Sequence, residues 1–386
     1  MIEEQRRIDA ITRFLQGEPA SVICKALGRS RRWFYKWLKR YDPGNSGWAY
    51  SLSRAPKNIS HKIPQPIADA VCEVRKRLLK TKYAQKGAFA IQWQLKQLGI
   101  KPLPEIWTIN RILKQQGLVD NPVYSPRAIP YPAAQATQPN DVHQFDLVGP
   151  RYLKSKERFY GAHLIDPFSN AVALKALPSK HDIHIVQAIV AAWQHLGIPR
   201  TLQVDNELSF RGSNRYPRSF GLLIRLCLYL GVELLFIPQG EPWRNGTVEK
   251  FNDVYDKLFL RPQRFASLKH LERELPVFES FHNRHHRYAK LGQRTPWAVH
   301  TAGAKRLLPK SFALQRRLIP WREGKISFIR LTDQRGAAQF FSERFVVAPA
   351  LVHEYVQGTI FTKLGLLKFY HQGKLIKVYR YPVNKD

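Results

Sequence analysis

The chain of 386 residues is too long for one ordinary domain, and a prior of roughly 100 to 200 residues per domain predicts two to four. Lys and Arg number 62 against 29 acids, and a formal net charge of +33 indicates a nucleic-acid partner; a membrane is disfavoured, because the cations are spread over many segments and no run of about 18 apolar residues exists. The three cysteines form no CxxC pair, which argues against a disulfide framework and a zinc finger, and the N-terminus has no apolar signal segment, so we expect a cytoplasmic protein.

Residues 1–45 predict a helix-turn-helix DNA-binding domain. Gly28 ends the second of two short amphipathic segments, and Ser30 is placed to cap a third, RRWFYKWLKRY, with Trp33 and Phe34 on its apolar stripe. The stretch from residue 29 to 40 contains no acid, as a helix lying in a DNA groove requires. The alternative is a plain three-helix bundle with a solvated basic face. The candidate DNA contacts are its six cations: Arg29, Arg31, Arg32, Lys36, Lys39 and Arg40.

Residues 60–120 predict a second helical module, either another helix-turn-helix DNA-binding domain, winged or not, or a plain helical spacer. Pro102 and Pro104 separate its last two helices, and Arg111 and Lys114 fall on the solvent face of the last as candidate DNA contacts. Residues 121–140 hold five prolines and no helical period, so we expect an extended linker there.

Residues 141–263 predict a mixed α/β core. Three strand-like segments precede the first helix, and strands then alternate with helices, which indicates an antiparallel meander followed by parallel strands covered by helices. Asp146 lies between Phe145 and Leu147 in the first strand, and Asp205 ends the fourth. A carboxylate in an apolar strand is costly unless it is hydrogen-bonded or binds a cation, so Asp146 is a strong candidate for a metal ligand.

Three motifs of this core, QFDLVGP, QVDNELSF and NGTVEKFND, resemble the catalytic core of DDE transposases of the retroviral-integrase superfamily, and they are most similar to bacterial insertion-sequence transposases of the IS481 and IS3 type. The helix-turn-helix start and the later GQRTPWAVH stretch extend the resemblance over nearly the whole chain. It implies an RNase H-like core in a prokaryotic, nucleoid-associated enzyme. One residue departs from the family pattern: Glu207 stands where glycine usually follows the Asp-Asn pair. The resemblance therefore does not predict the geometry of the turn after Asp205.

The third carboxylate of the site has two candidates, Glu241 and Glu249. Glu241 stands at the family's customary distance from Asp205, but it precedes Pro242 in a loop. Glu249 falls in the first turn of a helix, where the helix dipole and rigidity favour a positioned carboxylate, and its NGxVExxN context resembles the family's. The polar stretch 211–221, taken as an inserted loop, explains the longer spacing. We predict Glu249, with Asp253 in reserve.

Asp146, Asp205 and Glu249 are therefore the predicted catalytic and metal-binding residues. Carboxylates without His or Cys partners suit Mg²⁺, with Mn²⁺ able to substitute, and predict two-metal phosphoryl transfer in which Asp146 bridges both ions, Asp205 completes one and Glu249 the other. Asp166, before Pro167, is predicted as a turn residue. His282, His285 and His286 lack a cysteine partner and are interpreted as solvated or DNA-facing. Four further candidate DNA contacts surround Glu249: Arg244, Asn245, Lys250 and Lys257.

Residues 264–312 predict a helical connector, and residues 313–386 a small SH3-like β-barrel, since short apolar-polar alternations there are separated by turn signals. Six cations would leave this barrel basic and suited to phosphate contacts: Lys325, Arg330, Lys363, Lys368, Lys374 and Lys377.

The resemblance implies a transposase that binds the terminal inverted repeats of its element, cleaves there and joins 3′ ends to target DNA, acting on double-stranded DNA as a homo-oligomer, a dimer or larger. Two alternatives stay open. One is an RNase H-fold nuclease without strand transfer, and the other is a non-catalytic helix-turn-helix regulator.

Overall fold

The structure is a computed structural model that describes residues 3–53, 63–119, 134–212, 218–238, 240–303, 305–312 and 323–383. The chain divides into two compact units, Met1–Ile63 and Pro64–Asp386. Most of the expected linker at 121–140, and residues 313–322 at the start of the expected barrel, lie outside the described residues.

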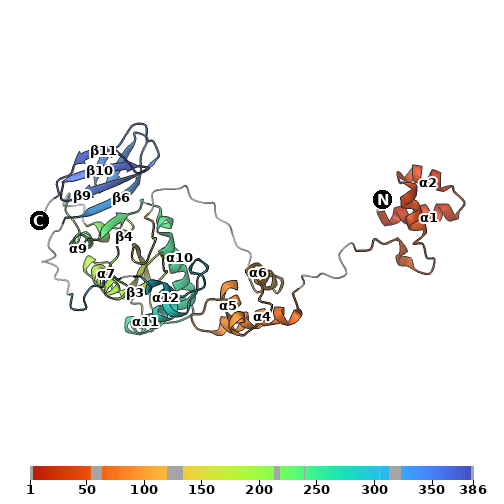
Figure 1. Cartoon of the computed structure of the whole chain (residues 1–386), viewed down its shortest axis with the longest axis horizontal. Helices are drawn as coiled ribbons and strands as arrows, with labels where there is room; N and C mark the ends of the chain where they lie inside the picture. Colours follow the sequence, from red (N-terminus) through yellow and green to blue (C-terminus); the bar gives the residue numbers. More distant parts are fainter. Residues whose placement is uncertain are drawn as a thin grey trace. The chain divides into compact units, whose positions relative to one another are not determined.

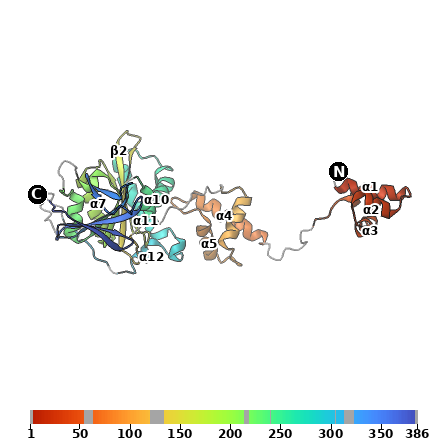
Figure 2. The ribbon, with the colours of Figure 1, turned by 90° about the horizontal axis from the view of Figure 1, so that it is seen from above.

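The first unit is a small helical bundle (Figures 1 and 2). Its core consists of Ala10, Ile11, Ile23, Cys24 and Phe34. Ser30 caps the third helix as expected, because its hydroxyl accepts the Trp33 N–H at 3.2 Å. The elements are α1 (Glu3–Leu15), α2 (Ala20–Leu27), α3 (Arg31–Leu38) and the short 3₁₀ turn η1 (Ser46–Ala49).

The second unit begins with a three-helix module, α4 (Gln65–Lys80), α5 (Ala88–Gln97) and α6 (Ile106–Gln115), whose helices pack against one another. α6 buries Ile109, Ile112 and Leu113 and exposes Arg111 and Lys114, as its apolar spacing predicts.

A central sheet follows, with its first five strands in the order β5-β4-β1-β2-β3. β1, β2 and β3 form the expected antiparallel meander, and β4 and β5 run parallel to β1. The elements of this core are β1 (Val142–Tyr152), β2 (Arg158–Ile165), β3 (Val172–Leu177), α7 (Asp182–His195), β4 (Thr201–Val204), α8 (Leu208–Arg211), α9 (Leu222–Leu230), β5 (Glu233–Phe236), η2 (Pro242–Asn245), α10 (Gly246–Tyr255) and the π-helical turn η3 (Asp256–Leu260).

Helices cover both faces of this sheet (Figures 1 and 2). On one face α7 and α9 bury apolar residues such as Ile189 and Leu223 against Phe145 of β1. On the other face α10 and α11 (Leu268–His285) contribute Phe251 and Phe278 to a second apolar cluster. The order of strands and the two covered faces give the three layers of an integrase-like α/β core.

The C-terminal region is antiparallel, as expected, but it also continues the central sheet. β6 pairs in parallel with β5, which gives a nine-stranded order β11-β10-β9-β6-β5-β4-β1-β2-β3, and Phe236 stacks on Phe328 with ring centroids 4.7 Å apart. These strands therefore share an apolar core with the central sheet instead of standing apart as a separate barrel. The strands are β6 (Lys325–Leu331), β7 (Ala337–Phe340), β8 (Glu343–Val346), β9 (Tyr355–Phe361), β10 (Leu366–His371) and β11 (Lys374–Arg380), with β7 and β8 forming a separate hairpin.

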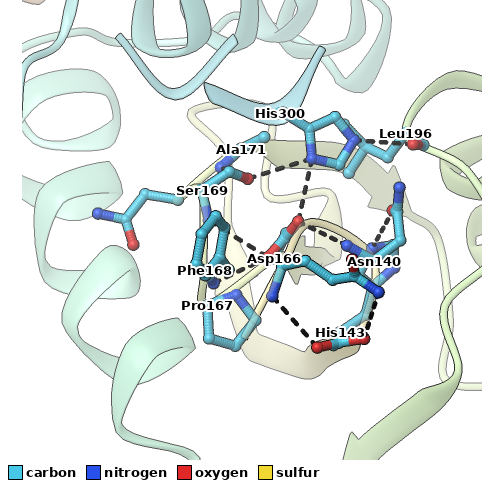
Figure 3. Close-up of polar contacts among 12 residues, drawn as sticks. Asn140, His143, Asp166, Pro167, Phe168, Ser169, Ala171, Leu196 and His300 are labelled. Carbon is cyan, nitrogen blue, oxygen red and sulfur yellow. Dashed lines mark hydrogen bonds and ion pairs between the residues drawn. The ribbon is translucent and has the colours of Figure 1, made fainter. Parts of the chain in front are cut away.

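A buried ion pair joins the connector to the core (Figure 3). His300 ends α12 (Pro296–His300), which follows the short turn η4 (Ala289–Leu291), and its Nδ1 lies 3.0 Å from Asp166 Oδ2, with both side chains fully buried. Asp166 Oδ1 also accepts the Phe168 N–H at 2.8 Å, which makes it the turn residue that the sequence predicts. Backbone hydrogen bonds and the His300 ring together hold the pKa of Asp166 below its usual value despite burial, which acts to raise it.

Candidate active site

The three predicted carboxylates come from three neighbouring elements. Gln144 of β1 is the register partner of Gln203 of β4, so Asp146 within β1 and Asp205 just after β4, each two residues further along, lie level with each other on adjacent parallel segments. Glu249 lies in the first turn of α10, which packs on β1. The expectation that adjacent strands bring Asp146 and Asp205 together follows from this register.

Asp205 and Glu249 are half-buried, and neighbouring carboxylates influence the pKa of each. Burial raises the pKa of Asp205 to about 6, and the Asp146 carboxylate adds to that rise. Burial also raises the pKa of Glu249, with further increases from Asp146 and Asp205. Burial and neighbouring charge thus disfavour the ionised forms of Asp205 and Glu249, which a nearby cation would stabilise.

Two buried glutamines and an asparagine set the geometry of the strands and of α10. Gln144 Oε1 accepts the backbone N–H groups of Thr247 and Val248 at 3.0 and 3.1 Å, which are otherwise unpaired in the first turn of α10. The Asn245 amide donates to the Phe145 carbonyl at 3.1 Å and accepts from Gln203 Nε2 at 3.2 Å. Sequence reasoning missed these glutamines; a polar residue two positions before each aspartate, on the same strand face, was the available signal.

Asp146 is held by a short hydrogen-bond chain. Asn252 Nδ2 donates to Asp146 Oδ2 at 2.6 Å, and Asn252 Oδ1 lies 2.8 Å from Nδ1 of the buried His163. Because the Asn252 oxygen can only accept, His163 must carry its proton on Nδ1. Sequence reasoning missed His163, whose register partner on β1 is Asp146.

Glu241 is not part of the carboxylate group. Its Oε2 accepts from Arg244 Nε at 2.7 Å, and its Oε1 accepts from the hydroxyl of Tyr355 at 2.8 Å. The two candidates for the third carboxylate differ in their surroundings: Asp146 and Asp205 add to the rise in the pKa of Glu249, whereas Glu241 forms an ion pair with Arg244.

Glu207, the departure from the family pattern, leaves the turn after Asp205 ordered. Its backbone N–H donates to Asp205 Oδ1 at 2.9 Å, and its carboxylate pairs with Lys180. The Glu207 backbone N–H and Lys180 lower the pKa of Asp205, whereas the Glu207 carboxylate raises it. The two ends of the stretch 211–221 lie close together, since Gly212 and Gly221 are in close backbone contact, and the residues between 212 and 218 lie outside the described part of the chain.

The donor set fits a hard divalent cation, since it consists of carboxylate oxygens. Within the described residues, no three His, Cys, Asp or Glu side chains are arranged closely enough to hold a metal ion. Binding an ion therefore requires the three carboxylates to move closer. The reserve ligand Asp253 does not face this group, because it is exposed and pairs with Lys257 on the next turn.

Most candidate DNA contacts of the first unit are accessible. Arg31, Arg32, Lys36 and Lys39 are exposed along and just after α3. The other two candidates make contacts within the protein: Arg29 pairs with Glu3, and Arg40 lies over the Trp37 ring.

Two candidate DNA contacts near Glu249 need correction. Asn245 is 2% exposed, and its amide is taken up by Phe145 and Gln203. The Arg244 side chain is 6% exposed and is bonded to Glu241 and Tyr355. Lys250 and Lys257 are exposed, as predicted.

The histidines of α11 also differ from expectation. His282 and His286 are buried, and each places a ring nitrogen against a backbone carbonyl, at Asn170 and Tyr83 respectively. Burial lowers the pKa of His286 to about 4, so these rings are neutral packing residues and do not face DNA. His285 is exposed.

Two family models match parts of the chain. A homeodomain-like domain matches residues 1–47, and an integrase core domain matches residues 230–296. Residues 230–296 are therefore similar to an integrase core domain. The second match spans β5 to the start of α12 and includes Glu249, whereas Asp146 and Asp205 lie before it. No curated protein matches the chain.

Solved structures of retroviral integrases resemble parts of the chain weakly. The catalytic core domain of HTLV-2 integrase, in complex with magnesium, is 18% identical, with a TM-score of 0.34, over 43% of this chain and 99% of that one. A simian T-cell lymphotropic virus intasome, in complex with a PP2A regulatory subunit, is 18% identical, with a TM-score of 0.38, over 58% of this chain and 75% of that one. The catalytic core domain of BIV integrase is 18% identical, with a TM-score of 0.33, over 42% of this chain and 95% of that one. Likeness at this level does not establish a shared activity.

No helix in the described part of the chain is long and apolar enough to cross a membrane.

Proposed function

We propose that the chain is a DNA transposase of the integrase type, which binds the terminal inverted repeats of an insertion sequence, cleaves DNA at those ends and joins the 3′-hydroxyls to target DNA. The observation that carries the proposal is the strand register that sets Asp146 beside Asp205, with α10 packed on the same strand and carrying Glu249 within the stretch that matches an integrase core domain.

The chain's own residues supply carboxylates that would hold two Mg²⁺ ions. Asp146 would bridge both, Asp205 would complete one and Glu249 the other. When bound, such ions activate a hydroxyl or water and stabilise the leaving 3′-oxygen. Asn252 holds one oxygen of Asp146 by a hydrogen bond, and Glu207 N–H holds one oxygen of Asp205. Cleavage by water frees a 3′-hydroxyl, whose oxygen then forms a bond with a target phosphorus while the target's 3′-oxygen leaves.

The two helical regions supply duplex recognition in this proposal. We assign residues 1–45 and 60–120 as helix-turn-helix domains, 121–140 as linker, 141–263 as catalytic core, 264–312 as connector and 313–386 as a barrel-like DNA-contacting domain. The exposed cations of α3 and the exposed Arg111 and Lys114 on α6 support phosphate contacts. We further propose that the protein acts on DNA as a homo-oligomer that brings two element ends together.

The experiment that tests the proposal combines purified protein, a duplex carrying the element end, a target plasmid and Mg²⁺. We expect cleaved ends and joined products from the wild type. Asp146→Asn, Asp205→Asn and Glu249→Gln should each lower both by at least about a hundredfold, because several kcal/mol of transition-state stabilisation are lost, while duplex binding persists.

The matched control is Glu241→Gln, which changes a neighbouring carboxylate in the same way. We expect it to retain cleavage within about tenfold of wild type, because an amide oxygen still accepts the Tyr355 hydrogen bond. Cleavage without joined product would favour a nuclease, and unchanged activity in all three carboxylate variants would favour a non-catalytic regulator. Loss of joining in Glu241→Gln alone would move the third ligand to Glu241.

A further inference from the structure

The C-terminal β region reaches two segments that carry or adjoin the candidate carboxylates. Arg330 of β6, predicted from sequence as a phosphate contact, is instead 6% exposed and points into the core. Its guanidinium donates to Asn206 Oδ1 and, at 3.1 Å, to the carbonyl of Ile237. Asn206 follows Asp205 directly and itself donates to the Ile237 carbonyl. Arg330 thereby fixes the turn that holds Asp205 to the end of β5.

Tyr355, at the start of β9, makes the second set of contacts. Its hydroxyl lies 2.8 Å from Glu241 Oε1 and 2.9 Å from Arg244 NH2, so the three side chains form a closed triangle with the 2.7 Å Glu241–Arg244 bond. Arg244 belongs to η2, which runs directly into α10 and Glu249. Tyr355 thereby fixes the segment from which the catalytic helix starts.

We propose that Arg330 and Tyr355 are positioning residues for the carboxylate site. Asp205 and Glu249 must move closer to share ions, and the turn and helix that carry them are braced by a separate region of the same chain. Hydrogen bonds to charged groups are stronger than neutral ones, and residues that orient metal ligands typically change metal affinity by about 10- to 100-fold. The C-terminal region thus completes the metal site in addition to any contact with DNA. This inference rests on the proposed function only in identifying Asp146, Asp205 and Glu249 as ligands.

Binding of Mn²⁺ to the full-length protein tests the inference without requiring activity. Free Mn²⁺ is measured by electron paramagnetic resonance for the wild type, Tyr355→Phe, Arg330→Lys and Arg330→Met. We expect Tyr355→Phe and Arg330→Met to raise the Mn²⁺ dissociation constant by about tenfold. Arg330→Lys keeps the charge and one donor and should recover part of that loss. Asp205→Asn, which removes a ligand, sets the lower limit of affinity.

Tyr370→Phe is the matched control, since Tyr370 lies on β10 of the same region and its hydroxyl has no hydrogen bond to the core loops among the described residues. It should bind Mn²⁺ like the wild type.

A purely structural role for Arg330 and Tyr355 would lower the melting temperature and the fraction of competent protein while leaving the Mn²⁺ dissociation constant unchanged. That result would overturn the inference, and so would wild-type Mn²⁺ affinity in Tyr355→Phe and Arg330→Met. Wild-type protein that binds Mn²⁺ but leaves DNA intact would refute the proposed transposase and leave this inference to be decided by the variants. A wild type that binds no Mn²⁺ would refute both.

Discussion

At the scale of single residues, the candidate site depends on polar side chains that hold the carboxylates. Asn252 bonds to Asp146, and Gln144 and Gln203 tie the strands bearing both aspartates to the start of α10. Each of these groups is buried or half-buried, so removing one leaves its partner unsatisfied at a cost of about 1–3 kcal/mol. The site is therefore specified by more residues than its three acids.

A buried glutamate on α11 gives a prediction for stability against pH. Burial raises the pKa of Glu279 from 4.5 to about 7, although its Oε2 accepts the Leu174 N–H at 2.7 Å. The folded state therefore favours the protonated acid, and this stabilisation is complete below the unfolded pKa and is lost as the pH rises through about 7. Glu279→Gln should raise the free energy of unfolding at pH 8 by roughly 2 kcal/mol relative to wild type and leave it nearly unchanged at pH 4.5.

Urea unfolding at several pH values, followed by circular dichroism, measures this difference. Glu272→Gln, an exposed change on the same helix, should give the same pH dependence as wild type. Parallel curves for Glu279→Gln and wild type would show that Glu279 titrates normally.

Local sequence was enough to predict some of these residues and not others. Glu249 could be preferred to Glu241 because helix position and flanking residues are local properties, and that choice stays a prediction. The burial of Arg244 depends on Tyr355, more than a hundred residues away, and no local pattern contains that contact. The buried His282 was missed for the same reason, since its neighbours include Asn170 of another segment.

At the scale of elements, the meander, the parallel strands and the last helix of the core were all predictable, because each follows from its own apolar period. The pairing of β6 with β5 was not, because both segments are short and the chain between them is long. A strand that ends one predicted domain and a strand that begins another give no signal that they will be neighbours. The antiparallel strands of the C-terminal region were therefore predicted, but their pairing with the central sheet was not.

The junction of α12 with the β2–β3 turn gives a prediction at this scale. Asp166→Asn removes the negative partner of His300 and weakens acceptance of the Asn140 N–H, all in a fully buried position (Figure 3). Breaking a buried pair typically costs about 3–5 kcal/mol, so we expect a lowered melting temperature and faster hydrogen exchange in α12. Asp253→Asn, at an exposed position, should change neither. Wild-type exchange in α12 would mean that the apolar contacts of that helix suffice to hold it.

At the scale of the whole molecule, the excess of cations governs how the chain meets DNA. Affinity for duplex should fall steeply with salt, and each phosphate contact contributes about 0.9 to the slope of log K against log salt. The net charge was evident from composition. The cations able to contact DNA were only partly predictable, because the side chains of Arg330 and Arg244 are buried.

Changing the exposed pair Arg31 and Arg32 to Gln should lower the salt slope by about two. Fluorescence anisotropy with an end-bearing duplex across a range of NaCl concentrations measures that slope. Lys25→Gln, an exposed cation on α2 away from α3, should leave it at the wild-type value. Identical slopes for the double variant and wild type would show that α3 does not lie against the DNA backbone.

The union of β5 with β6 also bears on how the protein is made. Phe236 leaves the ribosome well before Lys325, so a nascent polypeptide carries an open strand edge and lacks both Arg330 and Tyr355. On our inference, an incomplete translation product would bind its ions poorly. Synthesis from the N-terminus would then complete the candidate carboxylate site last, after the helical regions that we propose to recognise DNA.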